Sequence, residues 1–218
     1  MVKLIKYFIQ KIINIIGFNI TKIPKSELVS RIELKQKHIN NLKVVLNREE
    51  LLKYLPQNGY VAELGVDEGD FSKLILSINH PKELVLIDTW SSRRYNEKKM
   101  DIVKKKFKDE ISSGKIKIIR EKSEVALEQF KDNYFYWIYI DTAHTYEQTS
   151  KELEISRFKI KRGGIIAGHD YCQGSVEKAF HYGVIRAVNE FCLKYDWEII
   201  YLTIEASGCL SFALKEIE

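Results

Sequence analysis

Residues 61–72, VAELGVDEGDFS, hold the pattern that decides the fold of this chain. An apolar run leads into Glu63-x-Gly65-x-x-x-Gly69, and a helical pattern begins at Asp70. Glycine lets the backbone approach a ligand closely, and the start of a helix offers unpaired N–H groups to a charged one. The stretch therefore predicts a strand, a glycine turn and a helix that bind a charged ligand. Its glycine spacing differs from the G-x-G-x-x-G of the nicotinamide-binding turn, so a dehydrogenase is a less favoured alternative.

Length and composition describe an ordinary globular protein. The 218 residues are 45% hydrophobic and 30% charged, which suits one α/β domain with a large core. Three widely spaced cysteines without a C-x-x-C motif argue against a disulfide framework or a structural zinc site, and they favour the cytoplasm. The net charge of +5 arises from five lysines that precede the first acidic residue, Glu27. The neutral remainder argues against a nucleic-acid partner.

The first 48 residues are expected to form a helical extension, and residues 49–218 the main domain. Residues 3–16 carry lysines on one side and Ile, Leu and Phe on the other, which predicts an amphipathic helix. We expect this helix to pack on the core or on a second subunit of a homo-oligomer. The alternative is a peripheral anchor on the inner membrane surface. Residues 26–55 are expected to be helical, with Asn47 as an N-cap.

Strands and helices alternate from residue 60 onward, which predicts a parallel sheet covered by helices. The expected strands that follow the glycine turn are 83–87, 115–119, 135–140 and 163–167. Ligands of open α/β sheets bind at the carboxyl ends of the strands. The polar and glycine positions that fall at such ends are Gly65, Asp88, Asp141, His144, His169 and Asp170.

Two of the candidate binding residues have plain structural alternatives. Asp88 ends the second strand about twenty residues after the glycine turn, where an acidic side chain binds ribose hydroxyls. It could instead cap the following segment. Ser123 opens a helix and could simply cap it, or it could contact an adenine ring.

From about Glu49 to Leu193 the chain resembles bacterial class I S-adenosylmethionine (SAM) dependent methyltransferases of the sugar and macrolide O-methyltransferase type. The matching segments are VAELGVDEGDFS, LVLIDTW, WIYIDTAHTYE, GGIIAGHDY and GVIRAVNEF. The resemblance implies a Rossmann-like α/β fold with a seven-stranded mixed sheet and helices on both faces. Residues 196–202 and 210–214 would supply the last two strands, one of them antiparallel.

The resemblance also implies roles for individual residues. The SAM-binding residues would be Glu63, Gly65, Val66, Asp67, Gly69, Ser72, Asp88, Ser123 and Asp141. Metal-dependent relatives place ligands for Mg²⁺ or Mn²⁺ at the positions of Asp141, His169 and Asp170. The catalytic residues would be His144, Asp141 and His169.

Two of these positions depart from the metal-dependent pattern. His169 replaces a carboxylate, and imidazole is a poor ligand for Mg²⁺, so the site would suit Mn²⁺ better or His169 would face the substrate. His144 stands where the relatives carry a lysine base. Imidazole titrates near neutrality and can accept a hydroxyl proton as the methyl group arrives.

The sequence thus predicts an O-methyltransferase that acts on a hydroxyl of a sugar, sugar nucleotide or glycan intermediate, assisted by a divalent metal and a histidine base. The segment Tyr171 to Gly183 is the expected acceptor loop. The alternatives are an N-methyltransferase, a phenolic O-methyltransferase, or a SAM-binding scaffold that lacks catalysis.

Overall fold

The computed structural model describes residues 9–11, 32–175, 180–206 and 208–217. Most of the expected amphipathic helix over residues 3–16 therefore lies outside the described residues, although 9–11 are helical. Its contact with a membrane or a second subunit stays a prediction. Within the described ranges, no helix is long and apolar enough to cross a membrane.

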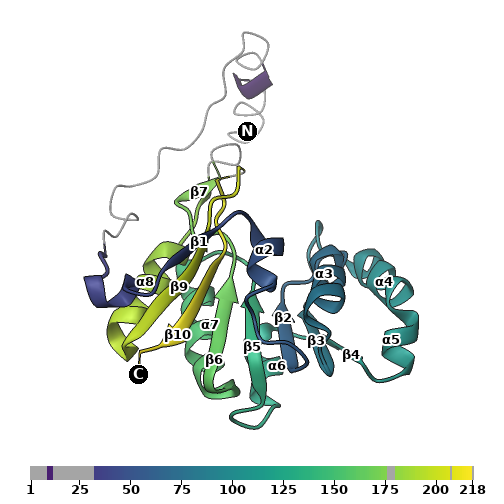
Figure 1. The fold of residues 1–218 in the computed structure, drawn as a ribbon. Coiled ribbons are helices and arrows are strands. Elements are labelled where there is room, and N and C mark those ends of the chain that lie inside the picture. The colour runs from purple at the N-terminus through teal and green to yellow at the C-terminus, as the bar shows by residue number, and fades with distance from the viewer. Residues whose placement is uncertain (1–8, 12–31, 176–179, 207, 218) are drawn as a thin grey trace.

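A mixed eight-stranded sheet forms the centre of the molecule, in the order β1-β9-β10-β6-β5-β2-β3-β4 (Figure 1). Only β10 runs antiparallel to its neighbours, β6 and β9, whereas the other pairs are parallel. The predicted Rossmann-like fold is confirmed, with one strand more than the seven expected. The strands are β1 (Lys43–Val45), β2 (Tyr60–Leu64), β3 (Glu83–Asp88), β4 (Ile116–Arg120), β5 (Phe135–Ile140), β6 (Ile160–Gly168), β9 (Trp197–Thr203) and β10 (Phe212–Glu216).

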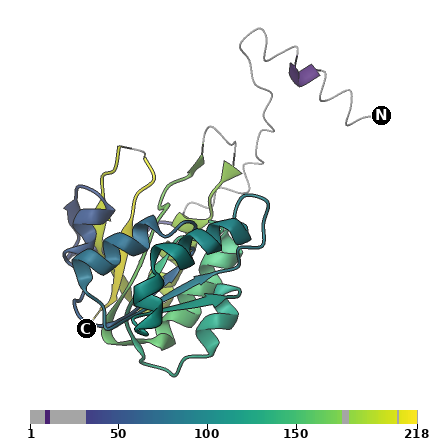
Figure 2. The same cartoon turned by 90° about the vertical axis from the view of Figure 1, so that its right-hand side faces the viewer.

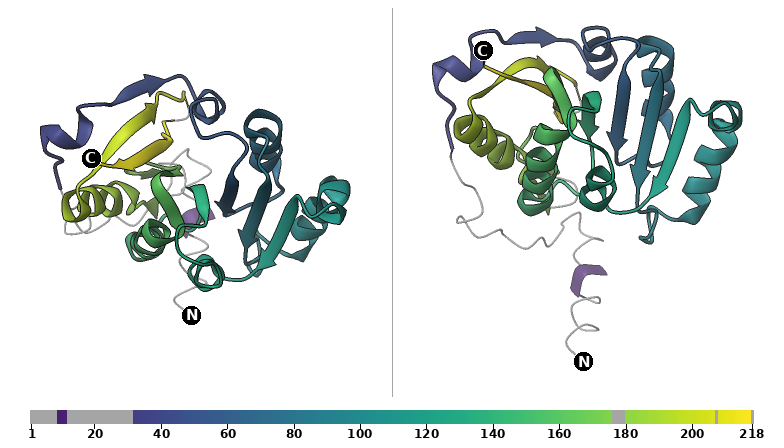
Figure 3. Two further views of the ribbon diagram at one scale, coloured as in Figure 1. Left: turned by 60° about the horizontal axis from the view of Figure 1, so that its bottom comes forward. Right: turned by 90° about the horizontal axis from the view of Figure 1, so that it is seen from below.

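Helices cover both faces of the sheet (Figure 3). One face carries α6, α7 and α8, and the other carries α2 and α3, while α4 and α5 lie towards the β4 end, which faces the viewer in Figure 2. A short antiparallel hairpin, β7 (Gly174–Ser175) and β8 (Phe180–His181), follows β6. The helices are the 3₁₀ helix η2 (Gln36–Ile39), α2 (Arg48–Leu52), α3 (Asp70–Asn79), α4 (Glu97–Lys106), α5 (Lys108–Ser112), α6 (Ser123–Glu128), α7 (Tyr146–Lys159) and α8 (Val184–Tyr195).

The alternation of side chains along each strand divides the core into two layers. In β3, Leu84 and Leu86 pack in the cluster formed with α2, α3 and α4. Val85 and Ile87 pack in the opposite cluster, formed with α6, α7 and α8. Successive strand residues point to opposite faces, so a central strand covered on both sides must be apolar throughout. The run Leu-Val-Leu-Ile meets this requirement.

The expectation of helix over residues 26–55 is wrong for its middle part. Lys43–Val45 instead form β1, which pairs in parallel with β9 and supplies the additional strand at one edge. The helix α2 begins only at Arg48. Asn47 is its N-cap, as expected, because its side-chain oxygen accepts a hydrogen bond from the Glu50 N–H at 2.9 Å. The sheet therefore includes residues before position 48. Farther along the chain, α4 ends at Lys106 and the short helix α5 follows at Lys108.

The order of the strands reverses between β2 and β5, and this switch point locates the site. The chain moves from β2 outward to β4, then returns so that β5 lies on the other side of β2. The Asp141 N–H donates to the Leu64 carbonyl at 2.8 Å, which holds the ends of the two strands together. Gly65 follows at once with φ of +87°, and a Cβ at this position would lie 1.9 Å from the Asp141 carbonyl oxygen.

We predict that Gly65→Ala destabilises the fold far more than Gly163→Ala. Both glycines have positive φ, but a Cβ on Gly163 meets no atom within 4 Å. Left-handed backbone strain should cost about 1–2 kcal/mol at Gly163. The collision with Asp141 should bring the loss at Gly65 to roughly 2–5 kcal/mol. Urea denaturation of both variants measures the difference, and equal losses would contradict the packing argument.

Candidate active site

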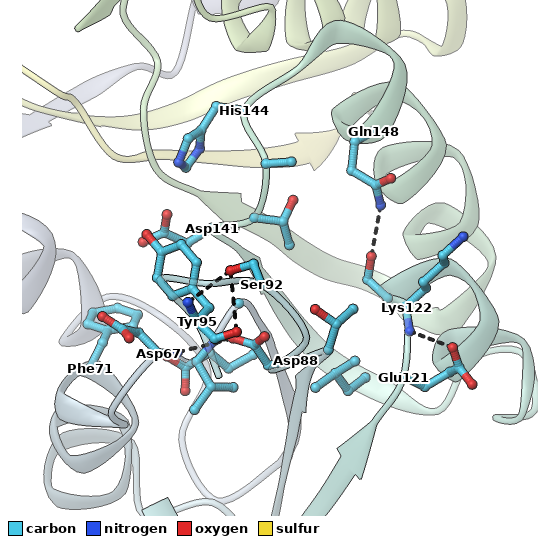
Figure 4. A pocket seen from close by; sticks show the side chains of 18 of the residues that line it. Asp67, Phe71, Asp88, Ser92, Tyr95, Glu121, Lys122, Asp141, His144 and Gln148 are labelled. Atoms are coloured by element: carbon cyan, nitrogen blue, oxygen red, sulfur yellow. Dashed lines mark hydrogen bonds between the residues drawn. The ribbon is translucent and has the colours of Figure 1, made fainter. Parts of the chain in front are cut away.

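A cavity of about 660 Å³ opens at the carboxyl ends of β2, β3 and β5 (Figure 4). This size is typical of small-molecule sites. The candidate residues on its wall are Glu63, Gly65, Val66, Asp67, Asp88, Ser123, Asp141 and His144. Four other candidates do not line this cavity: Gly69, Ser72, His169 and Asp170. The wall carries more carboxylates than cations, which favours a ligand with a positive centre.

Asp88 organises the glycine turn. One of its carboxylate oxygens accepts hydrogen bonds from the backbone N–H groups of Val66 at 2.9 Å and Asp67 at 3.2 Å. The other accepts the Trp90 N–H at 3.0 Å, and the Trp90 indole donates to the Asp67 carbonyl. Each carboxylate oxygen has two lone pairs, so a ligand hydroxyl can still bind. Asp88 therefore both holds the turn and faces the cavity.

Glu63 is a buried acid at the base of the cavity. Its side chain is covered almost completely, and the Ser72 hydroxyl donates to it at 2.5 Å. Burial raises the pKa of Glu63 to about 8, and the carboxylates of Asp141 and Asp88 act in the same direction. Ser72 thus positions Glu63 without lining the cavity itself. A cationic ligand nearby would favour the ionised form of Glu63.

A second buried acid, Glu152 on α7, binds Ser123. The Ser123 hydroxyl donates to Glu152, while the Gln148 amide donates to Ser123 at 3.0 Å and to Glu152 at 3.0 Å. The Thr142 hydroxyl donates to the other carboxylate oxygen at 2.8 Å. The N-cap of α6 is Lys122, and Ser123 is the first residue of the helix, so the cap alternative does not describe Ser123. Figure 4 shows Gln148 directed towards this end of the cavity.

Arg48 is a wall residue that the sequence did not single out. Its guanidinium lies 3.6 Å from Asp141 and 4.9 Å from the centre of the Phe71 ring. It is the first residue of α2, directly after the N-cap Asn47. Nothing in the local sequence distinguishes Arg48 from the other basic residues of that segment. Only the packing of α2 against the site brings it to the cavity.

His144 pairs with Asp170 across the site. The Nδ1 atom of His144 lies 3.0 Å from an Asp170 carboxylate oxygen, and the other oxygen lies 3.4 Å from Nδ1 of His169. Burial alone would raise the pKa of Asp170, but the two histidines outweigh it and lower that pKa. His144 and Asp170 both have φ near +60°, a left-handed conformation that non-glycine residues adopt infrequently.

Three candidate metal ligands converge, but not the three that the sequence predicted. One ligand atom each from Asp141, His144 and Asp170 lies within 4.8 Å of the others. His169 is not a member of this group: its Nδ1 atom faces Asp170, while its buried Nε2 atom makes no hydrogen bond and lies 3.7 Å from Glu205. Burial would lower the pKa of His169, but Asp170 and Asp141 outweigh it and raise that pKa. Glu205 was not anticipated, because it follows β9 in a loop without a motif.

Comparisons with known proteins agree with this fold. The sequence model of a family described as a methyltransferase domain matches residues 62–171. A search of curated proteins finds no match. Among solved structures, a proposed rRNA methylase from Clostridium thermocellum is 14% identical, with a TM-score of 0.58 over 79% of this chain and 99% of that one. A proposed methyltransferase from Streptococcus mutans in complex with SAH is 12% identical, with a TM-score of 0.55 over 78% and 96%.

The same fold also serves another reaction. Spermidine synthase from Thermotoga maritima is 14% identical, with a TM-score of 0.53 over 78% of this chain and 57% of that one. At these identities, the structural likeness shows the fold alone. The sequence family is the more specific finding: together with the fold, it defines a class I SAM-dependent methyltransferase. The chain belongs to the methyltransferase domain family.

We predict that Glu63→Gln changes how stability depends on pH. The pKa of Glu63 is about 8 in the folded protein and about 4.3 in an unfolded chain, so the ligand-free fold binds this proton more tightly. Its contribution to stability is complete below the unfolded pKa and is lost as pH rises towards 8. Between about pH 5 and pH 9 the wild type should lose stability relative to Glu63→Gln.

Chemical denaturation of the ligand-free proteins measures this difference. Glu128→Gln, an exposed glutamate at the end of α6, controls for loss of a charge. A constant difference between wild type and Glu63→Gln at all pH values would show that Glu63 titrates as an ordinary carboxyl group.

Proposed function

We propose that the protein transfers the methyl group of SAM to a hydroxyl of a sugar, a sugar nucleotide or a glycan intermediate. The observation that carries this proposal is His144, an imidazole on the cavity wall paired with Asp170 at 3.0 Å. When Nδ1–H donates to Asp170, the Nε2 atom is left with a lone pair and can accept a proton. A hydroxyl nucleophile needs such a base, because its proton must leave as the methyl group arrives.

The charge of the cavity supports SAM as its ligand. SAM carries a positive sulfonium, which suits a wall rich in carboxylates, whereas the diphosphate of a nicotinamide dinucleotide would be repelled. Asp88 would accept ribose hydroxyls, and the Ser123 and Gln148 end would hold the adenine. Glu63, Arg48 and the glycine turn would hold the methionine part, with the guanidinium facing its carboxylate.

The acceptor would enter beside the hairpin that follows β6. The centre of the His144 ring lies 4.8 Å from that of the Tyr182 ring. The Tyr182 ring in turn lies 5.7 Å, centre to centre, from the Phe180 ring. The Gly183 N–H donates to the His144 carbonyl at 2.8 Å, so the end of the expected acceptor loop is tied to the proposed base. Aromatic rings next to a base suit the apolar face of a sugar whose hydroxyl points at His144.

The donor set of Asp141, His144 and Asp170 fits a divalent ion that accepts two oxygens and one nitrogen, such as Mn²⁺. When bound, such an ion lowers the pKa of a coordinated hydroxyl. Asp141 and Asp170 would hold it, and His144 acts as base only while Nε2 is unligated. Asp141 suits this role because it lines the cavity, although burial raises its pKa.

Other acceptors remain as alternatives to a sugar hydroxyl. A phenol would use the same base, whereas an amine nucleophile needs proton removal less. The Clostridium thermocellum neighbour is described as an rRNA methylase, but this chain outside its first 25 residues is close to neutral, which disfavours RNA. A scaffold that only binds SAM would not need the His144–Asp170 pair.

We predict that His144→Ala lowers methyl transfer by about 10²–10⁴-fold, the usual contribution of a general base. The wild type is first screened for SAH release with free sugars, sugar nucleotides, phenols and amines. The variant is then measured with the best acceptor, and calorimetry should show unchanged SAM affinity. His80→Asn, an exposed histidine at the end of α3, is the matched control. Full activity in His144→Ala would remove the assignment of the base.

We predict that a chelator lowers the activity of the wild type and that Mn²⁺ restores it. Asp141→Asn should lose both the activity and the response to Mn²⁺, because it removes one of two carboxylate ligands. Activity is measured by SAH release, with bound metal quantified by elemental analysis. Full activity of metal-free protein would mean that Asp141 and Asp170 position the substrate or the base without an ion.

A further inference from the structure

Cys172 and Cys209 lie next to each other beside Asp170, outside the cavity described above. Cys172 follows β6, and Cys209 precedes β10. The two cysteines are 37 residues apart in sequence. Their sulfur atoms are 3.6 Å apart, and both residues are half-buried thiols. A carboxylate oxygen of Asp170 and the two sulfurs all lie within 4.8 Å of one another. The methyl-transfer proposal makes no use of the two thiols.

The backbone holds these three side chains in place. The Tyr171 N–H donates to the Leu210 carbonyl at 2.9 Å, so the β6–β10 pairing continues into the two loops. The Cys172 N–H donates to the Asp170 carbonyl at 2.7 Å, and Asp170 adopts φ of +61°. This tight turn puts the Asp170 and Cys172 side chains on the same side as Cys209. Main-chain contacts therefore hold the cluster together, and the Cys172 thiol also donates to the Cys209 sulfur.

The 3.6 Å separation of the sulfurs is that of a thiol–thiol hydrogen bond, and it is also close to the separation of two thiolates on one metal ion. Two thiolates on a tetrahedral zinc ion, each about 2.3 Å from it, are about 3.8 Å apart. A disulfide would need about 2.05 Å. We propose that Asp170, Cys172 and Cys209 bind a thiophilic divalent cation of the Zn²⁺ type, with water in the fourth position. Binding releases the two thiol protons to solvent, and the cation then holds two thiolates and one carboxylate.

This thiol site is distinct from the cluster of Asp141, His144 and Asp170 described above, but the two share Asp170. Thiolates select zinc-like ions, whereas carboxylates and imidazole suit Mn²⁺. A cation bound by Cys172 and Cys209 also binds the Asp170 carboxylate, which pairs with His144. Occupancy of the thiol site therefore withdraws Asp170 from His144 and inhibits methyl transfer. This consequence rests on the proposed function, whereas the binding itself does not.

The test uses the full chain, reduced with a phosphine, freed of metal and titrated with Co²⁺ and then Zn²⁺. Cobalt held by thiolates shows intense near-ultraviolet charge-transfer absorption, so the readout reports sulfur ligation directly. We expect one such Co²⁺ ion per chain, displaced by Zn²⁺. Cys172→Ser and Cys209→Ser should each weaken Zn²⁺ binding by more than about 10-fold, and the double variant should lose the absorption.

Three further variants separate this site from its neighbours. Cys192→Ala, which removes a buried thiol in α8, should bind as the wild type does. His144→Ala and Asp141→Asn should keep the thiolate absorption, because they alter only the other cluster.

The proposal fails if the wild type shows no thiolate absorption. It also fails if the double serine variant retains it or if Cys192→Ala abolishes it. Loss of two thiols per chain to a disulfide oxidant, without metal binding in the reduced form, would identify a redox pair and likewise overturn the proposal.

Discussion

The close approach of two strand ends is the constraint on which the rest of this molecule depends. Where β2 and β5 lie side by side, the carbonyl of Asp141 occupies the space that a Cβ on Gly65 would need. The Asp141 N–H meanwhile donates to Leu64. This contact places the glycine turn against the loop that carries Asp141 and His144. Gly65 is therefore required first by the fold: a larger residue would collide with protein backbone before it reached any ligand.

From this contact the site is assembled by carboxylates with different tasks. Asp88 accepts the N–H groups of the glycine turn and fixes its shape. Glu63 is buried beneath the turn with a raised pKa, and a nearby cation would favour its ionised form. Asp170 pairs with His144 and His169, and its pKa is lowered. A carboxyl group thus stabilises the turn, remains a buried acid or pairs with histidine, depending on its burial and its neighbours.

Asp170 connects the proposed chemistry with the proposed thiol site. It follows the end of β6, and the antiparallel β10 begins at this same edge, where Phe212 pairs with Gly168, so the loop before β10 places Cys209 beside Asp170. The one antiparallel strand of the sheet is therefore the reason that two distant cysteines meet. The site edge would otherwise be built only from the ends of parallel strands. A cation at this position would act on His144 through the carboxylate that both need.

The sequence by itself determined the alternating fold, the glycine turn and most of the cavity wall, because apolar periodicity and strand-end residues are local signals. It did not determine β1, whose three residues lie in a charged segment and become a strand only through pairing with β9. Nor did it determine that Arg48 would line the cavity, or that Cys172 and Cys209 would lie next to each other. It also did not show that His144, and not His169, would group with the carboxylates of Asp141 and Asp170. These contacts join residues far apart in the chain. Only the tertiary structure decides them, because side-chain direction and strand order set which groups meet.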